Sequence, residues 1–419
     1  MTGECQRHRQ RTWAVHVVDD LGVDCRAPMS KTEGPAFLIP LDDAQTPPVP
    51  RDEVARRYLG RLIALFHREK SEPFIADDKL HRATLRRLDE VVAPPACGPV
   101  LAEVGATVGK WLDRQPGASH ILTVVLPPCD ENAVIQTWAS EAGHQVLAPP
   151  SRQSLVAANQ PILPDMIGSG ILVIPRLEDW FLRHREGLRA VRALLAAIDG
   201  LDRPVVVGCN AWAWSFLAKA AGADALLPDA VTIKPFDAVR LHGWFVQLST
   251  SEATGAMRFR LPADGEDVLA VDEAGTLRND YLRKLAGRSL GIPWVAWHLW
   301  RRSLRTGDDA DVAEDAKAAM SDGDASEQTL WVAALDEYLL PGTDDGTALH
   351  ALHALLIHGP LTREELLLVL PGVADPNVVP VLLRAGFLER KGDRFGCRAA
   401  AYPAIRDGLE AAGFPVGRV

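Results

Sequence analysis

Continuous hydrophobic runs alternate with amphipathic segments through the middle of the chain. Each run is short and almost wholly apolar, as buried strands are, and most are followed by hydrophobic residues at helical spacing. Strands that alternate with helices pair in parallel through right-handed crossovers, so the pattern predicts an α/β fold with a parallel sheet over residues 98–250. The predicted strands are Ile121–Leu126, Gln145–Ala148, Ile171–Ile174, Pro204–Cys209 and Ala230–Ile233.

The segments around this core predict smaller units. Residues 1–50 lack a sustained period and are expected to form a loose arm with one short strand at 13–18. Residues 307–328 are acidic and rich in alanine, which indicates an exposed linker. The predicted domains are the arm at 1–50, a helical segment at 51–97, the α/β core at 98–250, a helical subdomain at 251–306, the linker at 307–328 and a last domain at 329–419. Helices are expected at 51–66, 81–92, 100–112, 180–198 and as a pair between 279 and 304 around Leu290-Gly291-Ile292-Pro293.

The last domain is expected to be a winged helix. Residues 349–357 predict a first helix, Thr362 and Glu365 form a capping box that opens a second, and Asp375-Pro376 begins a third. Residues 385–395 then predict strand, turn and strand, which is the wing. The third helix carries one acid and one base, so it offers little to phosphates or base edges. Docking on a protein or within the chain is therefore favoured over DNA binding, which stays open.

Composition narrows the class of protein. The chain has 419 residues, 47% of them hydrophobic and 24% charged, which is typical of two or three globular units. The net charge of −10 argues against a protein held on nucleic acid by its overall field. Six scattered cysteines indicate reduced thiols in a cytoplasmic protein, without a disulfide framework or a metal site. No hydrophobic stretch is long enough to insert in a bilayer, so direct membrane insertion is not expected.

Residues 98–304 resemble the AAA+ and STAND branch of the P-loop ATPases in the order of their elements. Four features occur in the order that this branch shows. They are a first strand with a turn at the phosphate position, a strand with acids near its end, a strand ending at Asn210, and a last strand followed by Pro235-Phe236-Asp237. The resemblance implies a P-loop-like core followed by a helical lid.

The residues that would handle ATP are replaced in this chain. A P-loop needs glycines, a lysine and a hydroxyl between strand and helix, but the chain has Pro127-Pro128-Cys129-Asp130 there. Proline removes backbone donors, and the acids repel phosphate. The GK pair at Gly109-Lys110 has the wrong spacing and lies inside a predicted helix. These replacements predict a pseudo-ATPase without catalytic residues.

The remaining ATPase positions are also altered. Pro175 stands where a magnesium-binding aspartate is expected, and Glu178 and Asp179 come late enough to begin the next helix. Asn210 resembles a sensor residue but is read first as a turn residue. In the lid, Arg288 is one of the nearby cations, and Trp294, Trp297 and Trp300 at helical spacing are read as a packed face.

The sequence therefore predicts a non-catalytic, ATPase-derived interaction or regulatory protein, without a cofactor or a bound metal. Its lid and winged helix would bind a protein partner, and self-association stays open. The alternative is a DNA-linked AAA+/STAND regulator with weak nucleotide binding. If a nucleotide binds, Asn210, Arg288 and Glu178 are the residues expected to contact it. A hydrolase is weakly supported, because no nucleophile-elbow motif occurs.

Overall fold

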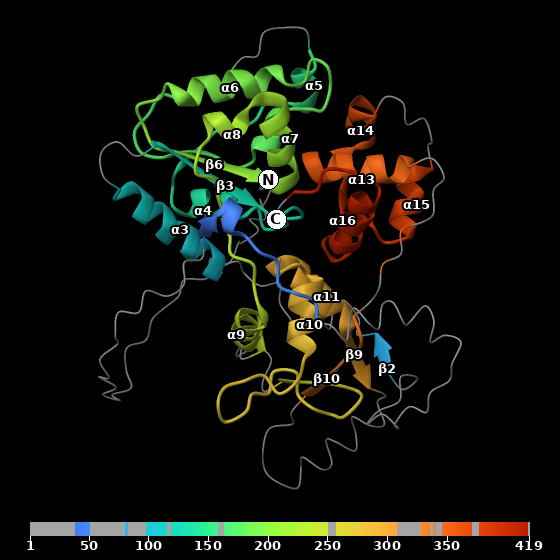
Figure 1. The fold of residues 1–419 in the computed structure, drawn as a ribbon. Coiled ribbons are helices and arrows are strands. Elements are labelled where there is room, and N and C mark those ends of the chain that lie inside the picture. Colours follow the sequence, from blue (N-terminus) through green and yellow to red (C-terminus); the bar gives the residue numbers. More distant parts are fainter. Residues whose placement is uncertain are drawn as a thin grey trace, which may run out of the picture. The chain divides into compact units, whose positions relative to one another are not determined.

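The computed structural model places most of the chain after residue 97. It describes residues 38–50, 80–82, 98–114, 119–157, 163–249, 257–307, 328–335, 338, 340, 346–370 and 377–417. The chain divides into Met1–Ala36 and Phe37–Val419, and the described residues all belong to the second unit (Figure 1). The strand expected at 13–18, the helix expected at 51–66 and nearly all of the expected linker lie outside the described residues.

The largest sheet has six strands in the order β1-β7-β3-β6-β5-β4. Five of them are parallel, and the short β1 joins the edge of β7 in the antiparallel sense. Every residue of the two central strands, β3 and β6, is buried. The predicted fold class, an α/β protein with a parallel sheet, is confirmed. The strands are β1 (Leu38–Pro40), β3 (Ile121–Leu126), β4 (Gln145–Val146), β5 (Leu172–Ile174), β6 (Val205–Asn210) and β7 (Val231–Ile233).

Helices cover both faces of this sheet. Figure 1 shows α6, α7 and α8 on one side of β3 and β6, with α3 and α4 on the other. The helix α6 turns its hydrophobic residues into the core, where Val191, Leu194 and Ile198 are fully buried. The helices are α3 (Gly98–Leu112), α4 (Val134–Glu141), α5 (Arg152–Leu155), the 3₁₀ turn η3 (Leu177–Trp180), α6 (Arg189–Asp199), α7 (Ala211–Ala221), α8 (Ala223–Leu226) and α9 (Ala238–Ser249).

One predicted helix begins later than its hydrophobic spacing indicated. The helix expected at 180–198 starts at Arg189, because residues 182–187 close a loop through a bond from the Leu182 amide to the Gly187 carbonyl. Any side chain at Gly187 would meet the Leu182 carbonyl oxygen at 2.3 Å. The close approach of two backbone segments, which spacing does not reveal, ends the helical pattern here.

A second sheet accompanies α10 (Tyr281–Arg288) and α11 (Pro293–Ser303), the helix pair at the place of the expected lid. Its order is β2-β9-β10-β8, with β8 and β10 parallel and the other pairs antiparallel. The helix pair predicted around Leu290 to Pro293 is present, but the predicted helical subdomain also contains strands. The strands are β2 (Leu80–Arg82), β8 (Met257–Arg260), β9 (Leu304–Gly307) and β10 (Gln328–Val332).

Two sequence expectations are corrected by this sheet. Residues 80–82 form a strand paired to β9, so the helix expected to begin at 81 is wrong at its start. Residues 328–332, expected to open the last domain, pair with β8 and β9. Pairing between segments far apart in sequence overrides the local pattern at both places.

Residues 346–417 form what we call the C-terminal module. Its three strands lie in the antiparallel order β11-β13-β12. The capping box predicted at Thr362 and Glu365 is confirmed at the start of α14. The elements are α13 (Thr347–His358), β11 (Leu361–Thr362), α14 (Arg363–Val369), α15 (Val378–Arg384), β12 (Leu388–Lys391), β13 (Arg394–Cys397) and α16 (Tyr402–Ala411). Within the described residues, no helix is both long and hydrophobic enough to cross a bilayer.

Candidate functional site

A cavity of about 230 Å³ lies at the carboxyl ends of β3, β5 and β6. Open parallel sheets bind their ligands at this edge, where the strand order reverses. The strand ends and the loops after them contribute residues 126–131, 175–176, 178 and 209–210, and the C-terminal module contributes residues from α13, β12 and β13. The C-terminal module therefore lies over the carboxyl-end edge of the parallel sheet.

The loop after β3 places the carboxylate of Asp130 at the start of α4. The two carboxylate oxygens of Asp130 accept hydrogen bonds from the backbone amides of Asn132, at 3.0 Å, and Val134, at 2.8 Å. Cys129 and Ala133 adopt left-handed backbone angles, with φ of 62° and 46°, which few residues other than glycine adopt. Burial raises the pKa of Asp130, and the amide donors oppose that effect. The Asp130 carboxylate thus occupies backbone amides at the start of a helix, a position that favours anions.

Glu178 and Asn210 meet at the ends of β5 and β6. Glu178 is 4% exposed, and its Oε2 accepts a hydrogen bond from the backbone amide of Asn210 at 3.2 Å. Its other oxygen lies 3.3 Å from the Nε of Arg176. Burial raises the pKa of Glu178, while Arg176 lowers it. Glu178 and Asp179 lie in the first turn of η3, as expected for residues that begin a helix.

Asn210 connects the core to the C-terminal module. Its Oδ1 accepts the Ala213 amide at 2.8 Å and caps α7, which agrees with its interpretation as a structural turn residue. Its Nδ2 donates to the Ile357 carbonyl at 3.0 Å, near the end of α13. Arg288 is not among the residues that line the cavity, and its Nη1 donates to the Leu335 carbonyl at 3.3 Å. The structure therefore brings together two of the three candidate nucleotide contacts, Asn210 and Glu178.

The lid tryptophans are a packed face. Trp294, Trp297 and Trp300 are 4%, 5% and 0% exposed, as the sequence predicted. The indole of Trp294 donates to the Pro128 carbonyl at 2.8 Å and so fixes the loop at the phosphate position. Gly109 and Lys110 lie inside α3, so the GK pair forms no phosphate loop.

Arg152 is a central residue that sequence reasoning missed. It is 9% exposed on α5, and its guanidinium donates to the Asp179 carboxylate at 2.7 Å and to the carbonyls of Glu178, at 3.1 Å, and Phe181, at 3.2 Å. It also donates to the His358 carbonyl of α13 at 2.8 Å, across 206 residues of sequence. Burial lowers the pKa of Arg152, and its acidic neighbours raise it. No local motif marks an arginine whose partners are this distant.

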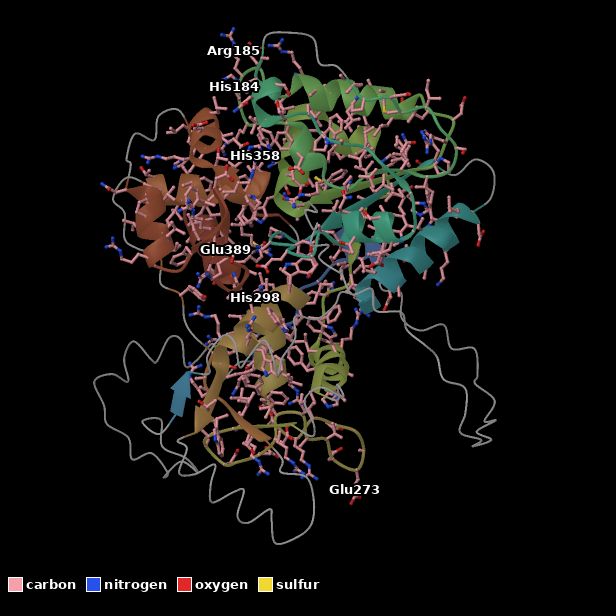
Figure 2. All side chains as sticks on the ribbon, turned by 180° about the vertical axis from the view of Figure 1, so that it is seen from behind. His184, Arg185, Glu273, His298, His358 and Glu389 are labelled. Carbon is pink, nitrogen blue, oxygen red and sulfur yellow. The ribbon has the colours of Figure 1, made fainter. Side chains whose placement is uncertain are left out.

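Glu131 joins three parts of the chain. Its carboxylate lies 3.3 Å from the Nε2 of His298 on α11 and 3.6 Å from the Nζ of Lys391 on β12. Lys391 also pairs with Glu389 at 3.0 Å. Figure 2 labels two of these residues, His298 on α11 and Glu389 on β12. Burial alone would raise the pKa of Glu131, but His298 and Lys391 outweigh it and lower the value to about 2.

Three thiols line the cavity without the chemistry of a nucleophile. Burial raises the pKa of Cys129, Cys209 and Cys397, which keeps each as a thiol and not as a reactive thiolate. Among the described residues, no group of three or more His, Cys, Asp or Glu side chains could hold a metal ion.

Comparison with known proteins gives structural matches of low similarity. No protein-family model and no curated protein matches the chain. A variant of RuvB from Thermotoga maritima is 13% identical with a TM-score of 0.27, over 82% of this chain and 98% of that one. Cdc6p of Pyrobaculum aerophilum is 12% identical with a TM-score of 0.26, over 78% and 99%. Drosophila ORC bound to DNA is 14% identical with a TM-score of 0.27, over 86% and 100%. TM-scores this low do not establish a common fold.

Proposed function

We propose that this chain is a non-catalytic, ATPase-derived interaction or regulatory protein whose nucleotide position is filled by its own residues. The carboxylate of Asp130 on the α4 amides carries the proposal. A phosphate at that place has to displace a bound carboxylate, and the Glu131 carboxylate stands next to it. Prolines 127 and 128 offer no backbone donors in compensation.

The end of α13 supports the same proposal. The last carbonyls of a helix carry partial negative charge and lack partners within the helix. Here Asn210 donates to the Ile357 carbonyl and Arg152 donates to the His358 carbonyl. One side-chain donor of the cavity lining, Asn210, and a buried cation near it, Arg152, are thus both bound to a helix end of the same chain.

The wider architecture is compatible with an AAA+-like core and a winged helix. The first parallel strand, β3, lies between β7 and β6, and the C-terminal module combines α13, α14 and α15 with three antiparallel strands. Arg384 is the one basic residue on α15, which favours docking on protein over contact with DNA phosphates. A protein partner or a second copy of the chain would bind the lid and module surfaces.

Nucleotide titration tests the proposal. We expect no heat and no thermal shift when magnesium-ATP, ADP or GTP is added to the full chain at millimolar concentration. A ligand present at about a hundred times its dissociation constant would stabilise the folded state by about 2.7 kcal/mol, a shift that is easily measured. Binding in the micromolar range would overturn the proposal and favour the nucleotide-binding, DNA-linked regulator. Light scattering at several concentrations would show whether copies of the chain associate.

A further inference from the structure

Two histidines of α13 lie against the core through one arginine. The Nδ1 of His353 is 3.0 Å from the Nη1 of Arg183, and the Nε2 of His358 accepts the backbone amide of Arg183 at 3.2 Å. We call these three residues the histidine contact. Figure 2 shows His358 where the C-terminal module approaches the core.

The donors at this contact require both imidazoles to be neutral. A guanidinium only donates hydrogen bonds, so the Nδ1 of His353 has to be the acceptor. The backbone amide of Arg183 likewise requires an unprotonated Nε2 on His358, which leaves the hydrogen on Nδ1. That Nδ1 is buried and has no hydrogen-bond partner. A second proton on either ring would turn an acceptor into a donor that faces another donor.

The surrounding charges also oppose a proton on these rings. Burial, Arg183 and His350 lower the pKa of His353 to about 4. Burial, Arg152, Arg183 and His353 lower the pKa of His358 well below its ordinary value. The other partners of the two rings are aromatic: Phe181, Trp212 and Phe414.

Three carboxylates on elements packed against α13 have cationic partners of their own. They pair as follows: Asp179 with Arg152 and Arg176, Glu178 with Arg176, and Glu365 with Arg394. Their negative charge is therefore already balanced, and it does not offset the cations that face the two imidazoles.

We propose that the histidine contact is a pH-sensitive latch, which holds the C-terminal module on the core at neutral pH and releases it when the medium becomes mildly acidic. Release would break the two bonds that Asn210 and Arg152 make to the end of α13 and would open the cavity at the sheet edge. The latch works within one chain and does not depend on whether a nucleotide binds.

The direction of the pH effect on docking depends on how many protons the docked and released states bind. A released imidazole has an ordinary pKa near 6.5, whereas the docked rings titrate lower. Between those values the released state binds more protons, so acid favours release. For one ring with values of about 6.5 released and about 4 docked, lowering the pH from 7.5 to 5.5 shifts the docking equilibrium about tenfold. The second ring adds to this shift.

Hydrogen exchange of the full chain at pH 7.5 and pH 5.5, corrected for intrinsic rates, tests the latch. We expect protection of α13 to fall about tenfold or more at pH 5.5, while α3 and β3 keep theirs. A double variant, His353→Asn with His358→Gln, places amide oxygens where the two acceptor nitrogens stand and does not titrate. It should keep α13 protected at both pH values. The matched control is His242→Gln on α9, which should lose protection as the wild type does.

Equal protection of wild-type α13 at both pH values would overturn the proposal, and so would an equal loss in the double variant. If the double variant does not fold, imidazole NMR of the wild-type chain decides the question. Titration of the two rings below their ordinary range, together with loss of α13 protection, supports the latch. Titration near pH 6.5 with α13 still protected overturns it.

Discussion

Gly359, at the scale of the single residue, allows α13 to end against the cavity. Its backbone angles, φ 69° and ψ −159°, belong to a region that is almost restricted to glycine. A side chain at this position would meet the Nη2 of Arg176 at 2.6 Å. The backbone angles therefore favour glycine where the C-terminal module meets the core, and a larger residue would also have to displace the end of the Arg176 side chain.

Gly359→Ala is expected to lower the free energy of unfolding by about 1–3 kcal/mol, because alanine disfavours these backbone angles and the Arg176 guanidinium has to move away from the added carbon. The measurement is the urea unfolding midpoint at pH 7.5. Gly392→Ala is the matched control, since Gly392 also has positive φ, at 65°, but nothing within 4 Å of the added carbon. The interpretation is wrong if both variants lose the same stability.

Helix α7, at the scale of the element, shares its amino-terminal cap with the contact to the C-terminal module. The side-chain oxygen of Asn210 caps the helix, and the amide nitrogen of the same side chain donates to a carbonyl of α13. The two roles need opposite hydrogen-bonding groups, and asparagine is a small side chain that supplies both. A carboxylate could serve the helix but not the contact.

Asn210→Asp separates the two roles. It keeps the cap but turns a buried negative charge toward the Ile357 carbonyl and Glu178, so we expect a loss of about 3 kcal/mol. Asn210→Ala loses the cap and the bond, for about 2 kcal/mol. Chemical denaturation of both variants measures the difference.

The control is a helix cap whose hydrogen bond stays within α5. Ser151→Ala removes only the cap of α5 and should cost about 1 kcal/mol. An Asn210→Asp variant as stable as the wild type would contradict the assigned contact.

The sequence predicted those elements whose signal is local. The runs of β3 and β6 are continuous and apolar, so their positions were predicted to within a residue, and the capping box of α14 needs residues only three apart. The start of β2 and the strand β10 depend on pairing with segments far away in sequence. The loop at 182–187 depends on a close approach of two backbone segments. Hydrophobic spacing could predict none of these.

The candidate site divides in the same way. Asn210 and Glu178 were predicted because each follows a recognisable strand, and the carboxyl ends of parallel strands share one edge of a sheet. Arg152, His353 and His358 were not, because their roles come from partners on other elements. Nothing near these residues in sequence indicates a buried contact.

At the scale of the whole molecule, Glu131 is where the core, the lid and the C-terminal module come together. Its partners His298 and Lys391 come from α11 and β12. A carboxylate whose pKa is lowered on folding stabilises the fold above its unfolded pKa, and that contribution disappears as the pH falls through the folded value. The stabilisation that Glu131 contributes is therefore lost as the pH falls from 4.5 to about 2.

Glu131→Gln is expected to be less stable than the wild type at pH 7 and at pH 5, with a difference that shrinks below pH 4.5 and nearly disappears toward pH 2. Urea midpoints of both proteins across this range measure the difference. Glu141→Gln, at an exposed position of α4, is the control and should show no such profile. A difference independent of pH would mean that the charge of Glu131 does not hold the junction.

The bond between Arg152 and the His358 carbonyl has a consequence for synthesis of the protein. The guanidinium belongs to the first half of the core, but its last acceptor is made 206 residues later. Until then the guanidinium of Arg152 has its nearer partners, Asp179 and the carbonyls of Glu178 and Phe181, but lacks its last acceptor. A buried donor without an acceptor is costly. The core therefore completes its packing only after most of the chain has left the ribosome. Contacts between such distant segments are slow to form, and nascent chains that stop before α13 expose an unfinished sheet edge to aggregation and to chaperones.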